Sequence, residues 1–280
     1  MREINVDKIR ETVKDLFIDA NYFLPKDISS LMRHACDAET SAGCKYALQC
    51  CLDNESASSE LNVPICQDTG MAVVFMEIGQ DVHFVGGSLR DAVNKGVADA
   101  YVGGFMRCSV VGDPLERVNT NDNTPAILYT EIVDGDRICI TAAPKGFGSE
   151  NMSALKMFNP SATDDDIVKF IVESVLKAGS KPCPPVVIGI GIGGDFEYSA
   201  MLAKKALIRN TDVRNSKKRY ADLEARILDE VNKTGIGAQG FGGDITALAV
   251  NIEEYPTHIA GLPVSLNMGC HVTRHKSVII

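Results

Sequence analysis

The 280-residue sequence is 45% hydrophobic and 23% charged, so it is long and apolar enough to bury the core of one large domain or of two smaller ones. Its formal net charge of −9 excludes the basic surface typical of nucleic-acid-binding proteins, although local arginines could still bind a small anion. No apolar run is long enough to cross a bilayer and the charged, amphipathic start does not resemble a secretion signal, so we expect a cytoplasmic protein without a nucleic-acid or membrane partner.

The first part of the sequence predicts helices. Apolar residues recur at helical spacing over residues 6–20 and about 26–53, and a proline separates the two stretches. Cys44 and Cys51 lie seven residues apart on the second stretch, which predicts that both face the core. We therefore expect a helical N-terminal part over about residues 1–60.

The next predicted elements are a strand over 71–79, an amphipathic helix over 88–104 that ends at a glycine, and a β-hairpin over 126–144. The hairpin is predicted from two β-rich runs on either side of the turn-forming pair Asp134–Gly135. A helix with an acidic start follows over 164–179.

In the second half, an apolar strand over 184–194 runs into a glycine loop, and the loop opens a helix over 195–209. A charged helix is expected over about 216–233 and a further strand over 244–255. Helices and strands mix without a regular β-α-β rhythm, which argues against a plain doubly wound sheet. The expected fold class is α/β in the α+β sense, with mixed sheets surrounded by helices and a helical N-terminal region.

Gly189, Gly191 and Gly194 match the G-x-G-x-x-G pattern of dinucleotide-binding loops. That pattern also requires an acidic residue at the end of a second strand about 20 residues later, and no strand is predicted before Asp212. Dinucleotide binding is therefore a weak hypothesis. It nevertheless keeps a nucleotide-binding oxidoreductase as an alternative from a different functional class.

Two glycine-rich stretches, 189–195 and 235–244, both end in Gly-Gly-Asp. Successive free backbone N–H groups in such loops can bind an anion. Tight turns explain the same glycines equally well, so both interpretations stay open.

The nine cysteines include no Cys-x-x-Cys pair, so neither a thioredoxin motif nor a zinc ribbon is indicated, and most are expected to be small core residues. Cys66, Cys183 and Cys270 differ from the others because each lies in a loop beside proline or glycine. Loops that can bend around a metal are where ligating thiolates are expected. Their wide separation in the chain matches no local cluster motif, so spacing alone does not distinguish a shared metal site from structural thiols.

Five segments of the chain match, in order, the motifs of one enzyme family. The segments are PICQDTG (64–70), RCSVVGDPLERVNTNDNTPA (107–126), APKGFGSENMS (143–153), KPCPPVVIGIGIGG (181–194) and THIAGLPVSLNMGCHVTRH (257–275). Through them the chain resembles the class I, iron–sulfur-dependent fumarate hydratase and L-tartrate dehydratase family, and in particular the alpha subunit of its two-subunit form. This resemblance extends over most of the chain and implies the mixed fold of the class I fumarase N-terminal domain.

The resemblance implies a [4Fe–4S] cluster held by Cys66, Cys183 and Cys270. Three thiolates leave one iron without a protein ligand, and an open metal position can act as a Lewis acid on a substrate oxygen. The implied reaction is the reversible hydration of fumarate to (S)-malate, with the dehydration of L-tartrate to oxaloacetate as its near alternative. A non-catalytic subunit with zinc at Cys270, His271 and His275 is a third hypothesis.

The resemblance also implies roles for residues near these cysteines. Asp68 would take part in proton transfer and would contact the substrate together with Gln67. His258 would be the histidine of the same proton relay, whereas without the resemblance it would be interpreted as an ordinary surface or core histidine. His271 and His275 have a spacing that suits zinc, but they are expected to be polar loop residues.

A dicarboxylate substrate needs cations and hydrogen-bond donors nearby. Arg107 is the expected carboxylate clamp, because a guanidinium binds a carboxylate through two parallel hydrogen bonds. The segment KGFGSEN matches the substrate loop of the family, in which Gly148 would let the ligand approach the backbone and Asn151 would donate to it. Lys145, at the start of this segment, is a weaker candidate.

Single-chain members of the family continue into a second domain that supplies further active-site residues, whereas this sequence ends at HVTRHKSVII. The resemblance therefore implies a single iron–sulfur hydro-lyase alpha-subunit domain over 1–280 that is active only with a beta subunit, in an α₂β₂ assembly. The isolated chain is expected to bind iron and to turn over little or no substrate.

Overall fold

The computed structural model describes residues 1–280, and these form two compact units. The first consists of Met1–Pro25, Glu55–Phe147 and Arg274–Ile280, and the second of Lys26–Asn54 and Gly148–Thr273. Each unit has its own four-stranded mixed sheet and its own apolar core, which confirms the expected α+β fold class. A single functional domain over the whole chain stays a prediction. No helix has the length and apolar character needed to span a membrane.

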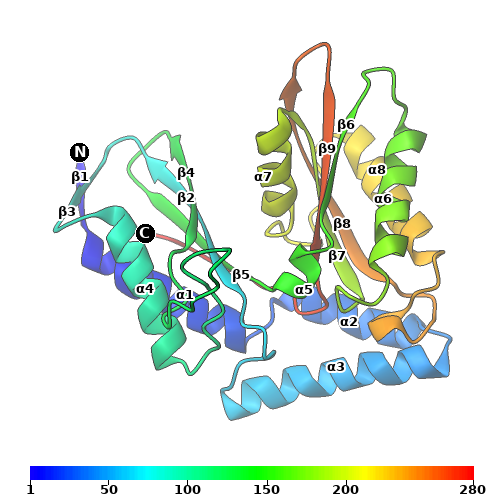
Figure 1. Ribbon diagram of the computed structural model, residues 1–280, viewed down its shortest axis with the longest axis horizontal. Coiled ribbons are helices and arrows are strands. Elements are labelled where there is room, and N and C mark those ends of the chain that lie inside the picture. The colour runs from blue at the N-terminus through cyan, green and yellow to red at the C-terminus, as the bar shows by residue number, and fades with distance from the viewer. The chain divides into compact units, whose positions relative to one another are not determined.

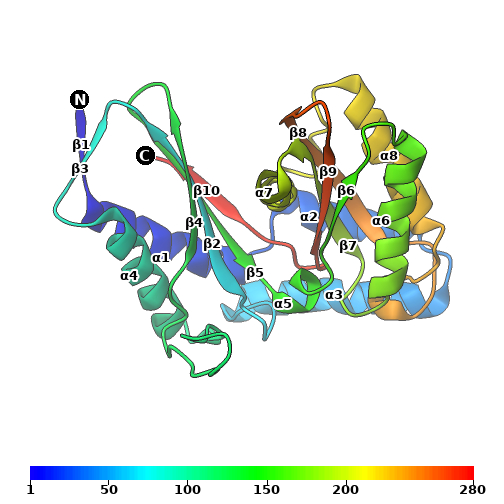
Figure 2. The same cartoon turned by 45° about the horizontal axis from the view of Figure 1, so that its top comes forward.

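The first unit is a mixed sheet with two helices on one face. Helices α1 (Val6–Tyr22) and α4 (Leu89–Gly103) cover that face, and their apolar sides meet alternate residues of the central strands in one buried cluster (Figures 1 and 2). A separate parallel pair joins β1 (Arg2–Asn5) to β3 (Val82–Val85). The strand order of the main sheet is β10–β5–β2–β4, with bounds Lys276–Ile279, Ile138–Lys145, Met71–Gly79 and Ile127–Val133.

A glycine sets the close approach of α4 to α1. A Cβ placed on Gly96 would lie 2.5 Å from the backbone oxygen of Arg10 and 3.0 Å from the Cβ of Val13, so only glycine fits there. One turn further along, the ring centroids of Phe17 and Tyr101 lie 6.0 Å apart in the fully buried centre of this unit. The helix interface thus brings Tyr101 into the core.

The prediction of a β-hairpin over 126–144 is wrong. β4 and β5 do not pair with each other, because β2 lies between them, parallel to β4 and antiparallel to β5. The Asp134–Gly135 turn instead wraps around the end of β2, where Gly79 N donates to Arg137 O at 2.8 Å and Asp81 N donates to Gly135 O at 3.0 Å. β2 is buried along most of its length, so the central position suits it better than an edge.

The second unit is a mixed sheet with helices on both faces. Helix α7 (Phe196–Ala206) lies on one face, and α6 (Asp164–Ala178) and α8 (Lys218–Asn232) lie on the other (Figures 1 and 2). The isoleucines of the central strand β7 point into the core shared with α6 and α8. The strand order is β6–β9–β7–β8, with bounds Ala154–Phe158, Leu262–Gly269, Val186–Gly194 and Ala247–Thr257.

The glycines of the G-x-G-x-x-G pattern have a packing role. Gly189 and Gly191 are buried inside β7 rather than in a loop. A Cβ on Gly189 would overlap the backbone oxygen of Ala203, and one on Gly191 would overlap that of Ser199, both in α7. The absent side chains therefore let α7 lie directly on the strand. This packing accounts for the spacing of these two glycines without a bound dinucleotide.

The helical stretch predicted over about 26–53 consists of two helices, α2 (Lys26–Ala38) and α3 (Ala42–Leu61). Glu39 lies at the break and is only 4% exposed. Its carboxylate accepts hydrogen bonds from the backbone N–H groups of Asp244 (2.9 Å to Oε2) and Ile245 (3.0 Å), at the end of the second glycine-rich stretch. The backbone N–H groups at the end of that stretch therefore do bind an anion, and the anion is the carboxylate of Glu39.

Candidate active site

The Asp68 carboxylate joins two of the sequence motifs. Its Oδ2 atom accepts a hydrogen bond from Phe147 N at 2.9 Å, and its Oδ1 atom accepts one from Gly70 N at 3.1 Å. A Cβ on Gly146 would lie 3.1 Å from Asp68 Oδ2, so glycine is needed for this approach. The predicted catalytic carboxylate is therefore held against the predicted substrate loop, which begins at Lys145.

Two buried side chains donate hydrogen bonds to the backbone of the 66–70 loop. The Tyr101 hydroxyl donates to the carbonyl oxygens of Thr69 (2.8 Å) and Gly70 (3.0 Å), and Arg274 Nη2 donates to Asp68 O at 2.7 Å. Burial raises the pKa of Tyr101 well above its ordinary value, so its hydroxyl stays a donor. Sequence reasoning missed both residues. Their only sequence signals are the place of Tyr101 on the apolar face of α4 and of Arg274 in the last motif.

Arg107 lies next to this loop through its backbone, since Thr69 Oγ1 donates to Arg107 O at 3.1 Å. Its side chain is exposed and forms no ion pair, so it is available to an anionic ligand. Gln67 is also exposed, and its Oε1 atom accepts a hydrogen bond from the Cys66 thiol at 3.3 Å. The first unit thus gathers Cys66, Gln67, Asp68 and Arg107 around one loop.

The structure makes Lys145 a stronger candidate for substrate binding than its sequence context indicates. It is 9% exposed, and its ammonium donates to Gly146 O at 3.1 Å. A Cβ on Gly70 would lie 2.6 Å from Lys145 N, so the 66–70 loop and the end of β5 are in backbone contact. A buried cation beside the Asp68 loop is a candidate partner for substrate charge.

In the second unit, Cys183 and Cys270 lie on neighbouring loops. The residue after Cys270, His271, donates its backbone N–H to Cys183 O at 3.1 Å. Cys183 is exposed and has a φ of 56°, the left-handed conformation that the flanking loop imposes, and Cys270 is half-buried directly after β9. The structure therefore brings together two of the three cysteines singled out by their loop positions.

Cys51 is close to the same two thiols. Burial, followed by the charges of Cys50, Cys183 and Cys270, raises the pKa of Cys51 to about 11. Cys51 is only half-buried, whereas Cys44 is fully buried as predicted and accepts a hydrogen bond from Ala238 N at 3.0 Å. The expectation that both face the core is therefore correct for Cys44 alone.

The residues of the predicted substrate loop lie in the second unit, beside the segment that carries Cys183. Gly148 and Asn151 are exposed at either side of the end of the short helix α5 (Phe147–Glu150). A Cβ on Gly148 would lie 3.4 Å from Lys181 O, two residues before Cys183. The loop therefore runs beside the segment that carries this cysteine.

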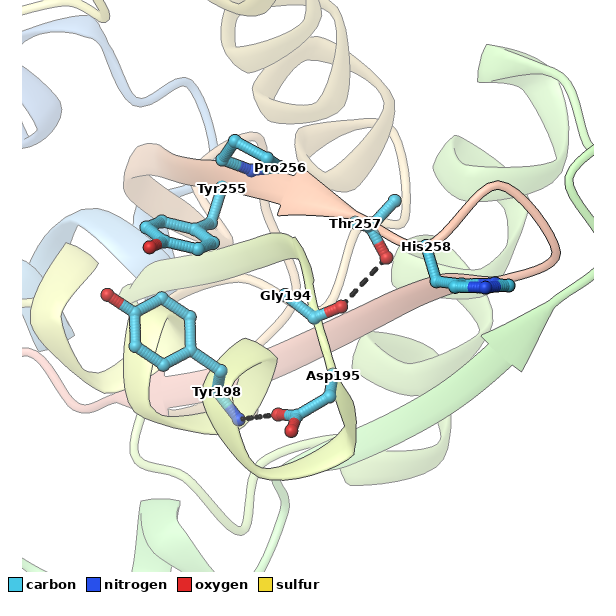
Figure 3. A pocket seen from close by; sticks show the side chains of 7 residues that line it. All are labelled: Gly194, Asp195, Tyr198, Tyr255, Pro256, Thr257 and His258. Carbon is cyan, nitrogen blue, oxygen red and sulfur yellow. Dashed lines mark hydrogen bonds between the residues drawn. The ribbon is translucent and has the colours of Figure 1, made fainter.

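His258 lies in a different part of the second unit. It lines a pocket of about 400 Å³ together with Gly194, Asp195, Tyr198, Tyr255, Pro256 and Thr257. Figure 3 shows its imidazole at the end of this pocket, away from the two tyrosine rings. His258 Nδ1 accepts a hydrogen bond from Ala260 N at 3.1 Å, so the neutral ring carries its proton on Nε2.

The sheet separates His258 from the cysteine loops. Near its start, β7 pairs with the end of β9 (Val187 with Gly269), and at its end it pairs with β8 (Gly194 with Thr257). Cys270 and His258 directly follow two of these partners, so they lie at opposite ends of β7. At the usual rise of a strand, that distance is roughly 23 Å.

The donor chemistry of Cys66, Cys183 and Cys270 suits a soft metal centre. None of the three forms a disulfide or is fully buried; Cys66 lies in the first unit and the other two lie in the second. Thiolates are the ligands that iron–sulfur clusters use. No three His, Cys, Asp or Glu side chains of the chain are arranged as ligands of one metal ion, for zinc or for iron.

The comparisons with known proteins agree on one family. The family model described as Fumarate hydratase (Fumerase) matches residues 10–279. A protein of Methanocaldococcus jannaschii named "Putative L(+)-tartrate dehydratase subunit alpha" is 41% identical over 274 residues, which are 95% of each chain. An L(+)-tartrate dehydratase subunit alpha of Escherichia coli is 30% identical over 279 residues, which are 98% of this chain and 91% of the relative.

Proposed function

Because the chain belongs to the fumarate hydratase family of hydro-lyases, we propose that it is the alpha subunit of an iron–sulfur enzyme that reversibly hydrates fumarate to (S)-malate. The observation that carries this proposal is the hydrogen bond from Phe147 N to Asp68 Oδ2 at 2.9 Å. It holds an acid–base group against an open, glycine-containing loop. In this proposal, the two backbone hydrogen bonds fix the carboxylate that moves a proton at a small diacid substrate.

We assign Cys66, Cys183 and Cys270 as the ligands of a [4Fe–4S] cluster. The neighbouring loops of Cys183 and Cys270 support this assignment, and none of the three thiols is fully buried. When bound, such a cluster supplies a Lewis-acidic iron that has no protein ligand. Cys51 lies close to two of the three thiols, but it is outside the five matching motifs, so it is not assigned as a ligand.

The remaining residues bind the substrate and move protons. Arg107 offers a free guanidinium to one carboxylate, and Asn151 and Gln67 are exposed amides that can donate to substrate oxygens. Gly148 leaves room for the substrate beside the backbone. Asp68 exchanges the proton at the substrate carbon, because its carboxylate is half-buried and held at both oxygens. The relay role of His258 stays a prediction.

We also propose that the enzyme works with a beta subunit as a cytoplasmic α₂β₂ assembly. The printed names of the relatives, "subunit alpha", support a second kind of subunit. Nine cysteines, none of them in a disulfide, are typical of a reducing compartment.

A second candidate substrate is L-tartrate. The names of the relatives at 41% and 30% identity favour it, since one is called "Putative L(+)-tartrate dehydratase subunit alpha" and the other "L(+)-tartrate dehydratase subunit alpha". Tartrate differs from malate by one more hydroxyl group, and the exposed amide of Gln67, next to Asp68, is a hydrogen-bonding partner for it. The same residues would serve both reactions.

The test is anaerobic purification of the chain together with its beta subunit, followed by iron and sulfide analysis and assays with fumarate, malate and L-tartrate. About four irons and four sulfides per chain, with turnover of one substrate, are expected. Serine variants of Cys66, Cys183 and Cys270 should each lose iron, whereas Cys139→Ser, on β5, should retain it. Bound NAD or zinc without iron, or full iron content in the three variants, would overturn the proposal.

A further inference from the structure

Glu150 links three elements of the second unit through one carboxylate. It is the last residue of α5, its Oε1 atom accepts from Lys204 Nζ of α7 at 2.6 Å, and its Oε2 atom accepts from Asn267 Nδ2 of β9 at 2.9 Å. Asn267 Nδ2 also donates to Ser153 Oγ at 3.0 Å. Both oxygens of the carboxylate are therefore committed to named donors, and this orientation is fixed at two points.

The linked elements lead directly to the candidate active site. Gly148 and Asn151 lie within two residues of Glu150 on the proposed substrate loop. Asn267 precedes the proposed cluster ligand Cys270 by three residues on β9. The loop that receives the substrate and the strand that ends at a cluster ligand are thus joined through Glu150.

The surroundings make this link firmer than a surface ion pair. The side chains of Glu150 and Lys204 are 25% and 15% exposed, and Asn267 is 5% exposed. An ion pair screened from water holds its geometry better than one at the surface, because the local dielectric constant is lower. Helix α7 is itself fixed to β9, since the Ser199 and Ser265 hydroxyls lie 2.7 Å apart in a buried contact. Lys204 is therefore presented from a rigid element.

We propose that Glu150 is a positioning residue that fixes the substrate loop relative to the strand leading to Cys270. It acts through Asn267 and Lys204, and it does not touch the substrate. The inference rests on the proposed function, because that function gives the loop its ligand. Loss of the link should displace Gly148 and Asn151 and weaken dicarboxylate binding while the cluster ligands stay in place.

The test uses the complex of the chain with its beta subunit. It exchanges the carboxylate at position 150 with the amide at position 267. Glu150→Gln keeps the shape but removes the charge that pairs with Lys204, and it places two amide donors together unless the Asn267 amide turns over. Asn267→Asp alone would place two carboxylates together. In the double variant, the amide introduced at position 150 donates to the carboxylate introduced at position 267. Asp222→Asn, which removes an exposed partner of Lys218, is the control.

Each single variant should raise KM about ten- to hundredfold, with a smaller change in kcat and unchanged iron content. The affinity for succinate, a dicarboxylate that cannot react, should fall by the same factor in calorimetry. The double variant should recover most of both losses, and the control should match the wild type. KM and succinate affinity within twofold of wild type in the single variants, or no recovery in the double variant, would overturn the inference. A wild-type complex that binds succinate but turns over none of the substrates would instead overturn the proposed function.

Discussion

Asp68 Oδ2 accepts a hydrogen bond from the backbone N–H of Phe147 at 2.9 Å, across 79 residues of sequence. This contact fixes the position of a carboxylate without neutralising it, because a backbone N–H carries no charge. Asp68→Asn should therefore leave the fold intact and lower kcat by about 10²- to 10⁴-fold, the usual contribution of a general acid or base. Initial rates and urea unfolding of the same preparations measure the two effects.

The control for this variant is Asp222→Asn, an exposed carboxylate on α8 that pairs only with Lys218. It should change neither the rate nor the free energy of unfolding by a measurable amount. Retention of the wild-type rate in Asp68→Asn would show that Asp68 has no part in proton transfer.

The hydroxyl of Tyr101 offers a second prediction, because it supports the same loop from the core. Tyr101→Phe removes the donor to the Thr69 carbonyl, while Gly70 O keeps its hydrogen bond from Asn123 Nδ2 at 3.0 Å. The free energy of unfolding should fall by about 1–3 kcal/mol. KM should also rise, since Asp68 lies next to the loosened carbonyl. Tyr46→Phe, on an exposed side chain of α3, should change neither quantity.

The sequence predicted those elements whose signals are local. Helix α6 begins at the capping box of Thr163 and Asp166 and ends at Gly179, all within its own segment. The hairpin prediction failed because the Asp134–Gly135 pair indicates a turn but not which strands flank it. The break between α2 and α3 was missed because the partners of Glu39, Asp244 and Ile245, lie some 200 residues away.

The residues of the candidate site also differ in whether the sequence around them carries a signal. Loop cysteines such as Cys183 stand out by their proline and glycine neighbours, and Asp68 by its place in a motif. Glu150 and Tyr101 could not be found from the sequence, because a carboxylate on a short helix and a tyrosine on an apolar face have ordinary local contexts. Their importance depends on what lies across the fold, namely Asn267 and the 66–70 loop.

Glu39 predicts how stability depends on pH. Burial alone would raise its pKa, but hydrogen bonds from Cys44 and from the backbone of Ser41, Asp244 and Ile245 outweigh burial and lower the pKa to about 2 from 4.5. A lowered folded-state pKa stabilises the protein above pH 4.5, and this stabilisation is lost as the pH falls toward 2. At neutral pH it amounts to at most about 3 kcal/mol.

Glu39→Gln should therefore reduce the free energy of unfolding at pH 7, and its difference from the wild type should shrink between pH 4.5 and 2. Urea unfolding at pH 7, 5, 4 and 3 measures this difference. An equal difference at pH 7 and pH 3 would mean that the charge of Glu39 contributes nothing and that only its shape matters.

Gly189 tests whether the glycine pattern serves packing. Gly189→Ala would place a Cβ against the backbone oxygen of Ala203 and the side chain of Leu207, and α7 would have to move. The expected loss of unfolding free energy is about 1–3 kcal/mol. Gly43→Ala is the matched control, because no atom lies within 4 Å of the added methyl group and alanine favours helix. An undiminished stability of Gly189→Ala would contradict the packing role.

His258 provides the last prediction, because of its position at the far end of β7. A proton donor must come within about 3 Å of the reacting atom, whereas His258 and Cys270 lie beside opposite ends of β7, roughly 23 Å apart. If His258 takes part in the reaction, it must therefore serve the site of another copy of the chain in the α₂β₂ assembly. His258→Asn and Cys270→Ser should each abolish activity when present in every alpha subunit.

Complexes assembled from equal amounts of the two inactive subunits distinguish the arrangements. A mixed pair contains one site in which the intact cysteines of one copy meet the intact histidine of the other. Random pairing should then restore about a quarter of the wild-type activity. Without exchange between copies, no mixed site is complete and the activity stays at the level of the separate variants. An unaltered rate in His258→Asn alone would remove this histidine from the reaction, and its pocket would then belong to a different process.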